Sequence, residues 1–410
     1  MSVVSSILQP VHNLASYMKS LNGYYLSRSI EELKEMTLME RVSIYNWYFE
    51  LCCICLMALV FFFYQFGMSI NTGRANMLFG ELNVYLKDHL NFDRVAFSDK
   101  QGNYLPYVEE QQKTWFTSYS TGRSAIASIS VRAHLYARSN PVASLIEWAL
   151  RFFFPSFIVH DIEEFAEIVI TPNGVYTASE TSQPNNNAKE ILNNYRFVSA
   201  IVNKSAMNES RSNNFFLSVT RTTESDKLPI EYVFMSEINQ FNNLFFHYAK
   251  KSFTTEILNK ASKFLKFISF TDLPAEKPVT DKEWEAGLIP RVVIRTGFIT
   301  SKEDLETLKE IVGLMVEIYD NCTRDLIQNS PNSIISADLV KKSVSLRAQE
   351  LAKIIKAMKQ AELELAMEKK LEAEREKRRQ LKSTGELSKV DQKMKEKRER
   401  RMKNKQKVRM

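Results

Sequence analysis

The chain has 410 residues, of which 44% are hydrophobic and 25% are charged, and its formal net charge is +7. This composition excludes an intrinsically disordered protein, because the apolar content is sufficient for one or two domains that each bury a core. Three of the four cysteines lie between Cys52 and Cys55, which excludes a disulfide scaffold and is compatible with a reducing compartment.

Residues 1–46 are predicted to be a short appendage and not a domain. In the acidic stretch SIEELKEMTLMERV, Ser29 is suited to cap a helix that has Glu31 and Glu32 in its first turn. The first 20 residues contain no apolar core of the kind that a signal peptide has.

The next segment, from Leu51 to Met68, contains no charged residue, and the uncharged stretch continues to Gly73. At about 1.5 Å per residue, roughly 20 such residues cross a hydrocarbon core about 30 Å thick. The run is too long and too far into the chain for a signal peptide, and it lacks the polar stripe that core helices usually have. It therefore predicts one transmembrane helix within residues 47–73. The membrane-spanning residues are expected to include Leu51, Leu56, Leu59 and Phe62.

Aromatic side chains flank the predicted span at positions suited to the headgroup region, and these are Tyr45, Trp47, Tyr48 and Tyr64. The basic residues within about 20 positions of the uncharged stretch are divided evenly between its two sides. They are Lys34, Arg41, Arg74 and Lys87. Charge alone therefore predicts neither orientation of the span.

The residues after the span predict an amphipathic helix followed by a loop. The apolar positions of this helix recur mostly at spacings of four, and they are Met77, Leu78, Leu82, Leu86 and Leu90. The helix is expected to begin after Arg74, and the loop lies around Asp99–Tyr107. From Ser124 to Val131 the β-branched residues fit neither a helical nor a strand period, so this segment has no predicted element.

A helix and a β-hairpin are predicted next. Pro141 introduces the helical stretch VASLIEWALRFFF, which ends before Pro155. Ala166–Thr171, with the sequence AEIVIT, predicts a strand that leads into a Pro-Asn-Gly turn. Val175–Thr177 is the expected hairpin partner of that strand.

Further strands and helices are predicted as far as residue 330. Ser182–Asn187 is expected to be an exposed loop. The strand-like runs after it are Arg196–Val202, Phe215–Thr220, Ile230–Phe234, Phe264–Phe270 and Val292–Thr296. Ser236 begins a helical region that continues toward Lys260. The apolar face of this region consists of Phe241, Leu244, Phe245 and Tyr248.

A long helix follows the last of these strands. Ser301 and Asp304 resemble a capping box at its start. Its buried side is expected to consist of Leu305, Leu308, Ile311, Val312, Met315 and Ile318. Residues 74–330 are therefore predicted to form one α+β domain.

Residues 331–410 are predicted to be a charged helical segment with a basic tail. Gln328–Ser333 is a polar linker, and Ser336 begins a second long helix that continues to about Leu381. A possible docking stripe on its first half consists of Val340, Val344, Leu351, Ile355 and Met358. The second half, AELELAMEKKLEAEREKRRQ, is charged on nearly all sides, which is typical of a solvated helix or of one that meets another charged surface.

The charge of the chain is concentrated at its end. Residues 375–410 contain sixteen Lys/Arg and five Asp/Glu, a net charge of +11, which leaves −4 for the other residues. A run of this kind is suited to the phosphates of RNA or of anionic lipid, although a solvated tail is the alternative. It contains no aromatic residue, so it is expected to follow a phosphate backbone and not to stack on bases. The predicted contact residues are Arg398, Arg400, Arg401, Lys403, Lys405, Lys407 and Arg409.

The sequence contains no convincing catalytic or metal-binding motif. The stretch HDIEE at His160–Glu164 lacks the second histidine, four residues on, that places two zinc ligands on one helix face. The cysteines of the span have no histidine neighbour. The chain is therefore predicted not to be an enzyme and to have no cofactor. A membrane-anchored enzyme would instead require a pocket with converging ionisable groups in residues 74–330.

Five sequence segments follow the aromatic-flanked span in a specific order. They are SISVRAHLYARSNPVASLIEWALRFFFP, IEYVFMSEINQF, SKFLKFISFTDLP, VVIRTGFITSKEDLETLKEIVGLMVEIYD and the ending RRMKNKQKVRM. From about Trp47 to Met410, this order resembles that of the calumin-type coiled-coil proteins of the endoplasmic reticulum, a subunit type of the PAT complex. Animal members have a long acidic lumenal region linked to calcium binding, whereas only residues 1–46 precede the span here, so calcium binding is not carried over.

The resemblance implies a single-pass protein of the endoplasmic reticulum membrane with a lumenal N-terminus and a cytosolic domain and C-terminus. It also implies a scaffold or chaperone subunit that acts beside the ribosome and the Sec translocon. Its further partners would be a small membrane chaperone of the PAT complex and nascent multi-pass membrane proteins. The residues themselves leave open a second function, that of a membrane-contact tether whose basic tail holds another anionic bilayer.

Overall fold

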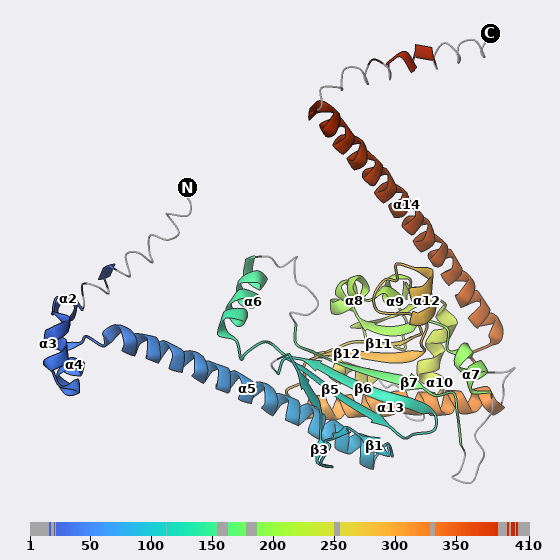
Figure 1. Cartoon of the computed structure of the whole chain (residues 1–410). Coiled ribbons are helices and arrows are strands. Elements are labelled where there is room, and N and C mark those ends of the chain that lie inside the picture. Colours follow the sequence, from blue (N-terminus) through green and yellow to red (C-terminus); the bar gives the residue numbers. More distant parts are fainter. Residues whose placement is uncertain are drawn as a thin grey trace.

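A long helix leads into an α+β domain, and a second long helix leaves that domain in the computed structural model of the chain (Figure 1). The structure describes residues 16–17, 20, 22–111, 113–153, 163–177, 187–249, 255–328, 333–383, 392, 395–397 and 399–400. The predicted fold class is therefore confirmed. The predicted loop Ser182–Asn187 and linker Gln328–Ser333 lie mostly outside the described residues, as does most of the basic tail.

Short helices precede the long one, and these are α2 (Gly23–Leu26), α3 (Ile30–Glu35) and α4 (Leu38–Ile44). The hydroxyl of Ser29 accepts a hydrogen bond from the backbone N–H of Glu32 at 3.2 Å, which confirms the predicted cap of α3. None of these three helices has a buried residue, so the segment packs no core of its own.

The predicted span and the amphipathic helix after it form one continuous helix, α5 (Tyr48–Asp88), which is about 60 Å long at 1.5 Å per residue. Its first half is exposed, whereas one face of its second half is buried. The buried residues recur at spacings of three and four, and they are Gly67, Asn71, Ala75, Leu78, Phe79, Leu82, Asn83 and Leu86. The helix therefore passes from an apolar segment into the core of the domain without a break.

A ten-stranded antiparallel sheet forms the centre of the domain. Its strands are β1 (Arg94–Val95), β4 (Val108–Glu110), β5 (Trp115–Thr121), β6 (Ile126–His134), β7 (Phe165–Pro172), β8 (Ser199–Asn203), β9 (Arg221–Thr223), β10 (Tyr232–Ser236), β11 (Leu265–Thr271) and β12 (Arg291–Gly297). The order across the sheet is β1-β5-β6-β7-β12-β11-β8-β10-β9, and β4 also pairs with β5. A separate pair consists of β2 (Phe97–Ser98) and β3 (Tyr104–Leu105), so the predicted loop at residues 99–107 contains a strand.

Helices cover both faces of this sheet. On one face lie the second half of α5, α7 (Ala188–Asn194), α10 (Leu244–His247), α11 (Thr255–Ala261) and α13 (Lys302–Gln328). On the other lie α8 (Met207–Asn213), α9 (Phe215–Ser218), α12 (Asp281–Gly287) and the part of α14 (Ala337–Ser383) around Ile354. Two short 3₁₀ helices, η3 (Lys204–Ala206) and η4 (Asn239–Asn243), follow β8 and β10. The larger core therefore lies on the α13 side, and all six predicted apolar residues of α13 are buried in it.

Two predicted strands are wrong. Val175–Thr177 is not a strand, because β7 is paired on both sides by β6 and β12 and has no free edge for a hairpin partner. Phe215–Thr220 is instead the helix α9, whose consecutive Phe216 and Leu217 are both buried. A short apolar run fits either a strand or a buried helical turn, and length and periodicity cannot separate the two.

The segment without a predicted element is β6. The register of β6 against β7 shifts between Ile126 and Ser128, so one extra residue enters the strand. The inward-facing residues are consequently Ile126, Ile129, Val131 and Ala133. This irregularity breaks the strict alternation that identifies a strand in a sequence.

The helical region predicted from Ser236 toward Lys260 begins later and is broken into η4, α10 and α11. Ser236 is the last residue of β10. The four predicted face residues, Phe241, Leu244, Phe245 and Tyr248, are nevertheless all buried in the larger core. The apolar pattern was therefore correct, although the helix boundaries were not.

Candidate functional site

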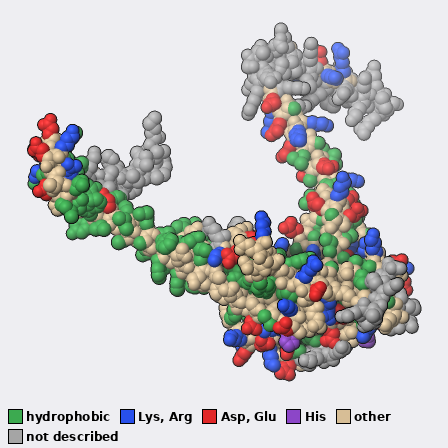
Figure 2. Space-filling model, turned by 60° about the horizontal axis from the view of Figure 1, so that its bottom comes forward, with side chains coloured by type: hydrophobic (Ala, Val, Ile, Leu, Met, Phe, Trp, Pro, Cys, Tyr) green, Lys and Arg blue, Asp and Glu red, His purple; other side chains and the backbone are tan. Residues whose placement is uncertain are grey.

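The membrane-facing surface begins with the first half of α5. Within the described residues, α5 is the one helix long and apolar enough to cross a bilayer. The four predicted span residues, Leu51, Leu56, Leu59 and Phe62, are each more than half exposed. Hydrophobic side chains cover the first half of α5 along its length (Figure 2). Such a surface is suited to lipid and not to water.

A second apolar surface lies on α6 (Pro141–Phe153), the helix predicted after Pro141. Its exposed hydrophobic residues are Val142, Ile146, Trp148, Leu150, Phe152 and Phe153. Thirteen residues extend for about 20 Å, which is too short to cross a bilayer but suits a helix that lies in the interface. The sequence predicted the helix but not its exposure. The three aromatic residues among its last six were the available signal for a membrane contact.

A close contact joins α5 to the domain at the inner end of the span. Gly67 is buried against the turn at Arg138 and Ser139, and a Cβ added to it would lie 2.1 Å from the carbonyl oxygen of Arg138. Only glycine allows this approach. The contact therefore fixes the point on α5 at which the domain begins.

A polar network reinforces this junction. The Glu164 carboxylate accepts hydrogen bonds from Nη1 of Arg74 on α5 at 2.9 Å and from Nη1 of Arg138 at 2.5 Å. The amide of Asn71 donates to the carbonyl oxygens of Lys113 and Tyr136 at 2.9 and 3.0 Å. Because these partners lie far apart in the sequence, the network holds α5 rigidly against the sheet.

The ionised form of Glu164 contributes to this rigidity. Burial alone would raise the pKa of Glu164, but the hydrogen bonds and charges of Arg138 and Arg74 outweigh it and lower the pKa. A carboxyl whose folded pKa is lowered stabilises the fold above its unfolded value of 4.5 and loses this contribution as the pH falls through the folded pKa. The junction is therefore fully charged at neutral pH.

Replacing Gly67 with alanine is expected to destabilise the protein by about 1–3 kcal/mol, because the new methyl group must displace the backbone at Arg138. Gly73 is the matched control on the same helix, since a Cβ there meets no atom within 4 Å. Gly73→Ala should be neutral or stabilising, because alanine favours the helix. Denaturation of the detergent-solubilised protein measures both effects. Equal stability of the two variants would show that the contact at Gly67 is not tight.

The basic tail lies almost entirely outside the described residues. Of its seven predicted contact residues, only Arg400 lies within them, and it is exposed. The helix α14 carries the tail away from the domain, because every side chain from Ala361 to Ala373 is exposed. Beyond Met358, α14 continues for roughly 37 Å to Ser383.

Of the acidic stretch at His160–Glu164, the structure describes Glu163 and Glu164, and both carboxylates bind basic side chains. Glu163 accepts a hydrogen bond from Lys266 at 2.6 Å, and Glu164 belongs to the junction. Within the described residues, no group of three or more His, Cys, Asp or Glu side chains is placed to hold a metal ion. Burial raises the pKa of the Cys322 thiol to about 12, which leaves it unreactive.

Comparisons with known proteins agree on one family. The family model described as PAT complex subunit CCDC47 matches residues 46–401. The chain is 50% identical, over 88% of both proteins, to the UPF0674 endoplasmic reticulum membrane protein YNR021W of Saccharomyces cerevisiae. It is 27% identical, over 71% of this chain and 69% of the relative, to the UPF0674 endoplasmic reticulum membrane protein C2G5.01 of Schizosaccharomyces pombe. The chain therefore belongs to the family of PAT complex subunit CCDC47.

Proposed function

We propose that the protein is a non-enzymatic scaffold or chaperone subunit at the ribosome–translocon complex, where it assists the insertion and folding of multi-pass membrane proteins in the endoplasmic reticulum. The observation that carries the proposal is a single chain that joins a bilayer-length apolar helix rigidly to a folded domain and then to a basic tail. The family description and the names of the relatives support a role in the endoplasmic reticulum membrane. The Sec translocon, a small PAT complex chaperone and nascent multi-pass proteins are the proposed partners.

The proposed place of each segment follows from its charge and its exposed apolar surface. Residues 1–46 are lumenal, residues 47–73 cross the bilayer, residues 74–330 form the cytosolic domain and residues 331–410 reach the ribosome. The α6 helix gives the domain a second contact with the cytosolic leaflet, since its aromatic side chains lack a protein partner that buries them among the described residues. Two membrane contacts hold a domain in one orientation, which a scaffold requires.

The tail is proposed to bind ribosomal RNA through its phosphates. Each neutralised phosphate releases counterions, so the affinity falls as salt is added. No aromatic residue is present in residues 375–410 to stack on unpaired bases. The contact is therefore expected to be strong at low salt and insensitive to RNA sequence.

Co-sedimentation of the full-length protein in nanodiscs with ribosomes or with anionic liposomes, across a salt series, tests this function. Binding to ribosomes that persists at physiological salt, with weaker binding to liposomes, is the expected result. Preferential binding to the liposomes would instead support a membrane-contact tether, in which the tail holds a second bilayer by charge. Binding to neither would contradict both functions.

The orientation of the span makes a separate prediction. Asn203, Asn208 and Asn321 each begin an Asn-x-Ser/Thr sequon after α5, and none is expected to be glycosylated if the domain is cytosolic. Asn208 is the most informative, because it is exposed, whereas Asn203 is buried and bonded to the Ser262 carbonyl oxygen. A mobility shift that an endoglycosidase reverses would overturn the orientation. A sequon engineered into residues 22–46 should accept a glycan and serves as the positive control.

A further inference from the structure

The base of α14 rests on the domain through a stripe that is partly polar. The buried or half-buried residues of this stripe are Val340, Ser343, Arg347, Leu351 and Ile354. Their spacings of three and four place them on one face of the helix. The stripe predicted from apolar residues alone is wrong at Val344, which is 42% exposed, whereas Arg347 is only 6% exposed. A charged side chain therefore occupies the middle of the contact.

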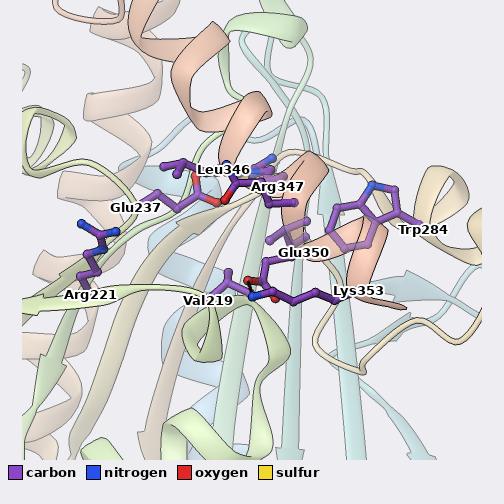
Figure 3. A pocket seen from close by; sticks show the side chains of 10 residues that line it. Val219, Arg221, Glu237, Trp284, Leu346, Arg347, Glu350 and Lys353 are labelled. Carbon is purple, nitrogen blue, oxygen red and sulfur yellow. Dashed lines mark hydrogen bonds and ion pairs between the residues drawn. The ribbon is translucent and has the colours of Figure 1, made fainter. Parts of the chain in front are cut away.

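Arg347 is shared by two carboxylates of the sheet. Its Nε donates to Oε1 of Glu237 at 2.8 Å, its Nη2 donates to Oε2 of Glu237 at 3.1 Å, and its Nη1 donates to Oδ2 of Asp272 at 2.5 Å. The Ser343 hydroxyl, one turn earlier, also donates to Glu237. Figure 3 shows Arg347 reaching from α14 to Glu237.

The topology of the sheet explains why two carboxylates meet at this point. Strands β10 and β11 both pair antiparallel with β8. They therefore run in the same direction, and their C-terminal ends lie on the same side of the sheet. Glu237 directly follows β10, and Asp272 directly follows β11. The sheet therefore presents two neighbouring carboxylates to α14, which covers these strand ends.

The apolar packing around this ion cluster is incomplete. A cavity of about 300 Å³ lies on one side of it, between α14 and residues such as Trp284 and Leu273. A more open groove of about 670 Å³ lies next to this cavity, along β9. Glu237 and Leu346 line both the cavity and the groove. On this face of the sheet, the apolar contacts of α14 with the core come from Leu351 and Ile354, beyond the ion cluster.

We propose that Arg347 is the latch that holds the base of α14 on the domain, so that α14 swings away as a unit when this guanidinium is removed. Without it, Glu237 and Asp272 would be two buried carboxylates that have lost the cation bonded to both, which is strongly unfavourable even though Arg291 still acts on Asp272 through its charge. Release of α14 hydrates both acids while the hydrogen bonds within the helix and the sheet stay intact. The burial of Asp272 already raises its pKa, and Arg347 offsets this only in part, so the acid is poorly solvated even in the latched state.

The start of α14 supplies the pivot for this movement. Ile335 and Val340 are buried in the larger core, and the Ser333 hydroxyl lies 3.2 Å from the hydroxyl of Tyr248. These contacts do not involve Glu237 or Asp272, so they persist when the latch opens. The latch sets the direction in which α14 carries the tail, and it does not depend on what the tail binds.

Hydroxyl-radical footprinting of the full-length protein in nanodiscs tests the latch. Trp284 and Met235 belong to the same smaller core as Ile354 of α14, whereas Met315 lies in the larger core on the opposite face of the sheet. In Arg347→Met, the docked state should lose roughly a hundredfold or more in population relative to the released state. Oxidation of Trp284 and Met235 should then rise several-fold, while Met315 stays protected. Lys356→Met is the matched control, because Lys356 is exposed on the same helix and should leave all three residues protected.

A compensated variant separates charge from packing. If Glu237→Gln and Asp272→Asn are added to Arg347→Met, all three members of the ion cluster are neutral, and the protection of Trp284 and Met235 should return toward that of the original protein. Three results would overturn the latch. These are unchanged protection in Arg347→Met, oxidation of Met315 together with Met235, which would mean general unfolding, and a compensated variant as exposed as Arg347→Met.

Discussion

Replacing Leu59 with arginine is expected to prevent stable insertion of the chain into the membrane. Leu59 lies near the middle of the apolar half of α5 and is more than half exposed, so no part of the described chain would shield the new charge. A charge near the centre of a transmembrane helix costs about 2.5–3.5 kcal/mol on insertion scales. Carbonate extraction of microsomes should therefore release Leu59→Arg while the original protein stays in the pellet.

Val84 provides the matched control for this substitution. It lies on the same helix and is equally exposed, but it belongs to the half of α5 that packs into the domain. Val84→Arg places the same charge in water, so the variant should resist extraction like the original protein. Full resistance of Leu59→Arg would mean that residues 51–68 do not anchor the chain.

Neutralising the tail is expected to have the second large effect. Six basic residues are replaced by glutamine, and these are Arg398, Arg400, Arg401, Lys403, Lys405 and Lys407. If most of them contact RNA phosphates, the log–log salt slope of ribosome binding should fall in magnitude by several units, since each phosphate contributes about 0.9 in B-DNA. Membrane anchoring and the stability of the domain should not change, because α14 separates the tail from the core.

Two controls separate net charge from other properties of the tail. Exchanging Arg398, Arg400 and Arg401 for lysine should have a much smaller effect, because a backbone-following tail requires charge and not the guanidinium shape. Neutralising exposed lysines of α14, such as Lys356 and Lys359, should also have little effect, because residues 337–374 of that helix have eight Lys/Arg and seven Asp/Glu and so are nearly neutral. An unchanged salt slope in the six-residue variant would place the ribosome contact in the folded domain. Loss of liposome binding alone would favour the tether.

The strongly periodic parts of the fold could be predicted from the sequence. The span follows from its long uncharged run, α6 from the prolines at its ends, and α13 from the helical recurrence of its apolar residues, all six of which are buried. The strand β6 was missed because a register shift at Ile126 breaks its alternation. The sequence predicts a strand where α9 lies because four residues are too few to show a period.

The candidate site could be predicted only where it depends on local sequence. The exposed span residues follow from an uncharged run, and the tail follows from its charge. The junction at Gly67 depends on Arg138 and Glu164, which reach α5 only through the folding of β6 and β7. The sequence does not identify Arg347, because a buried cation looks the same in the sequence as an exposed one. Its role follows only from the fold, which brings Glu237 and Asp272 together at the ends of two strands.

The central claim is that one chain connects the bilayer of the endoplasmic reticulum to the ribosome. A side-chain-resolution map of ribosomes isolated with this protein from the membrane tests that claim most directly. The account predicts α5 in the bilayer beside the translocon, the sheet domain on the ribosome side and the residues after Ser383 along ribosomal RNA phosphates. A map that places the domain in the lumen, or one that shows the domain with no contact between the tail and RNA, would contradict it.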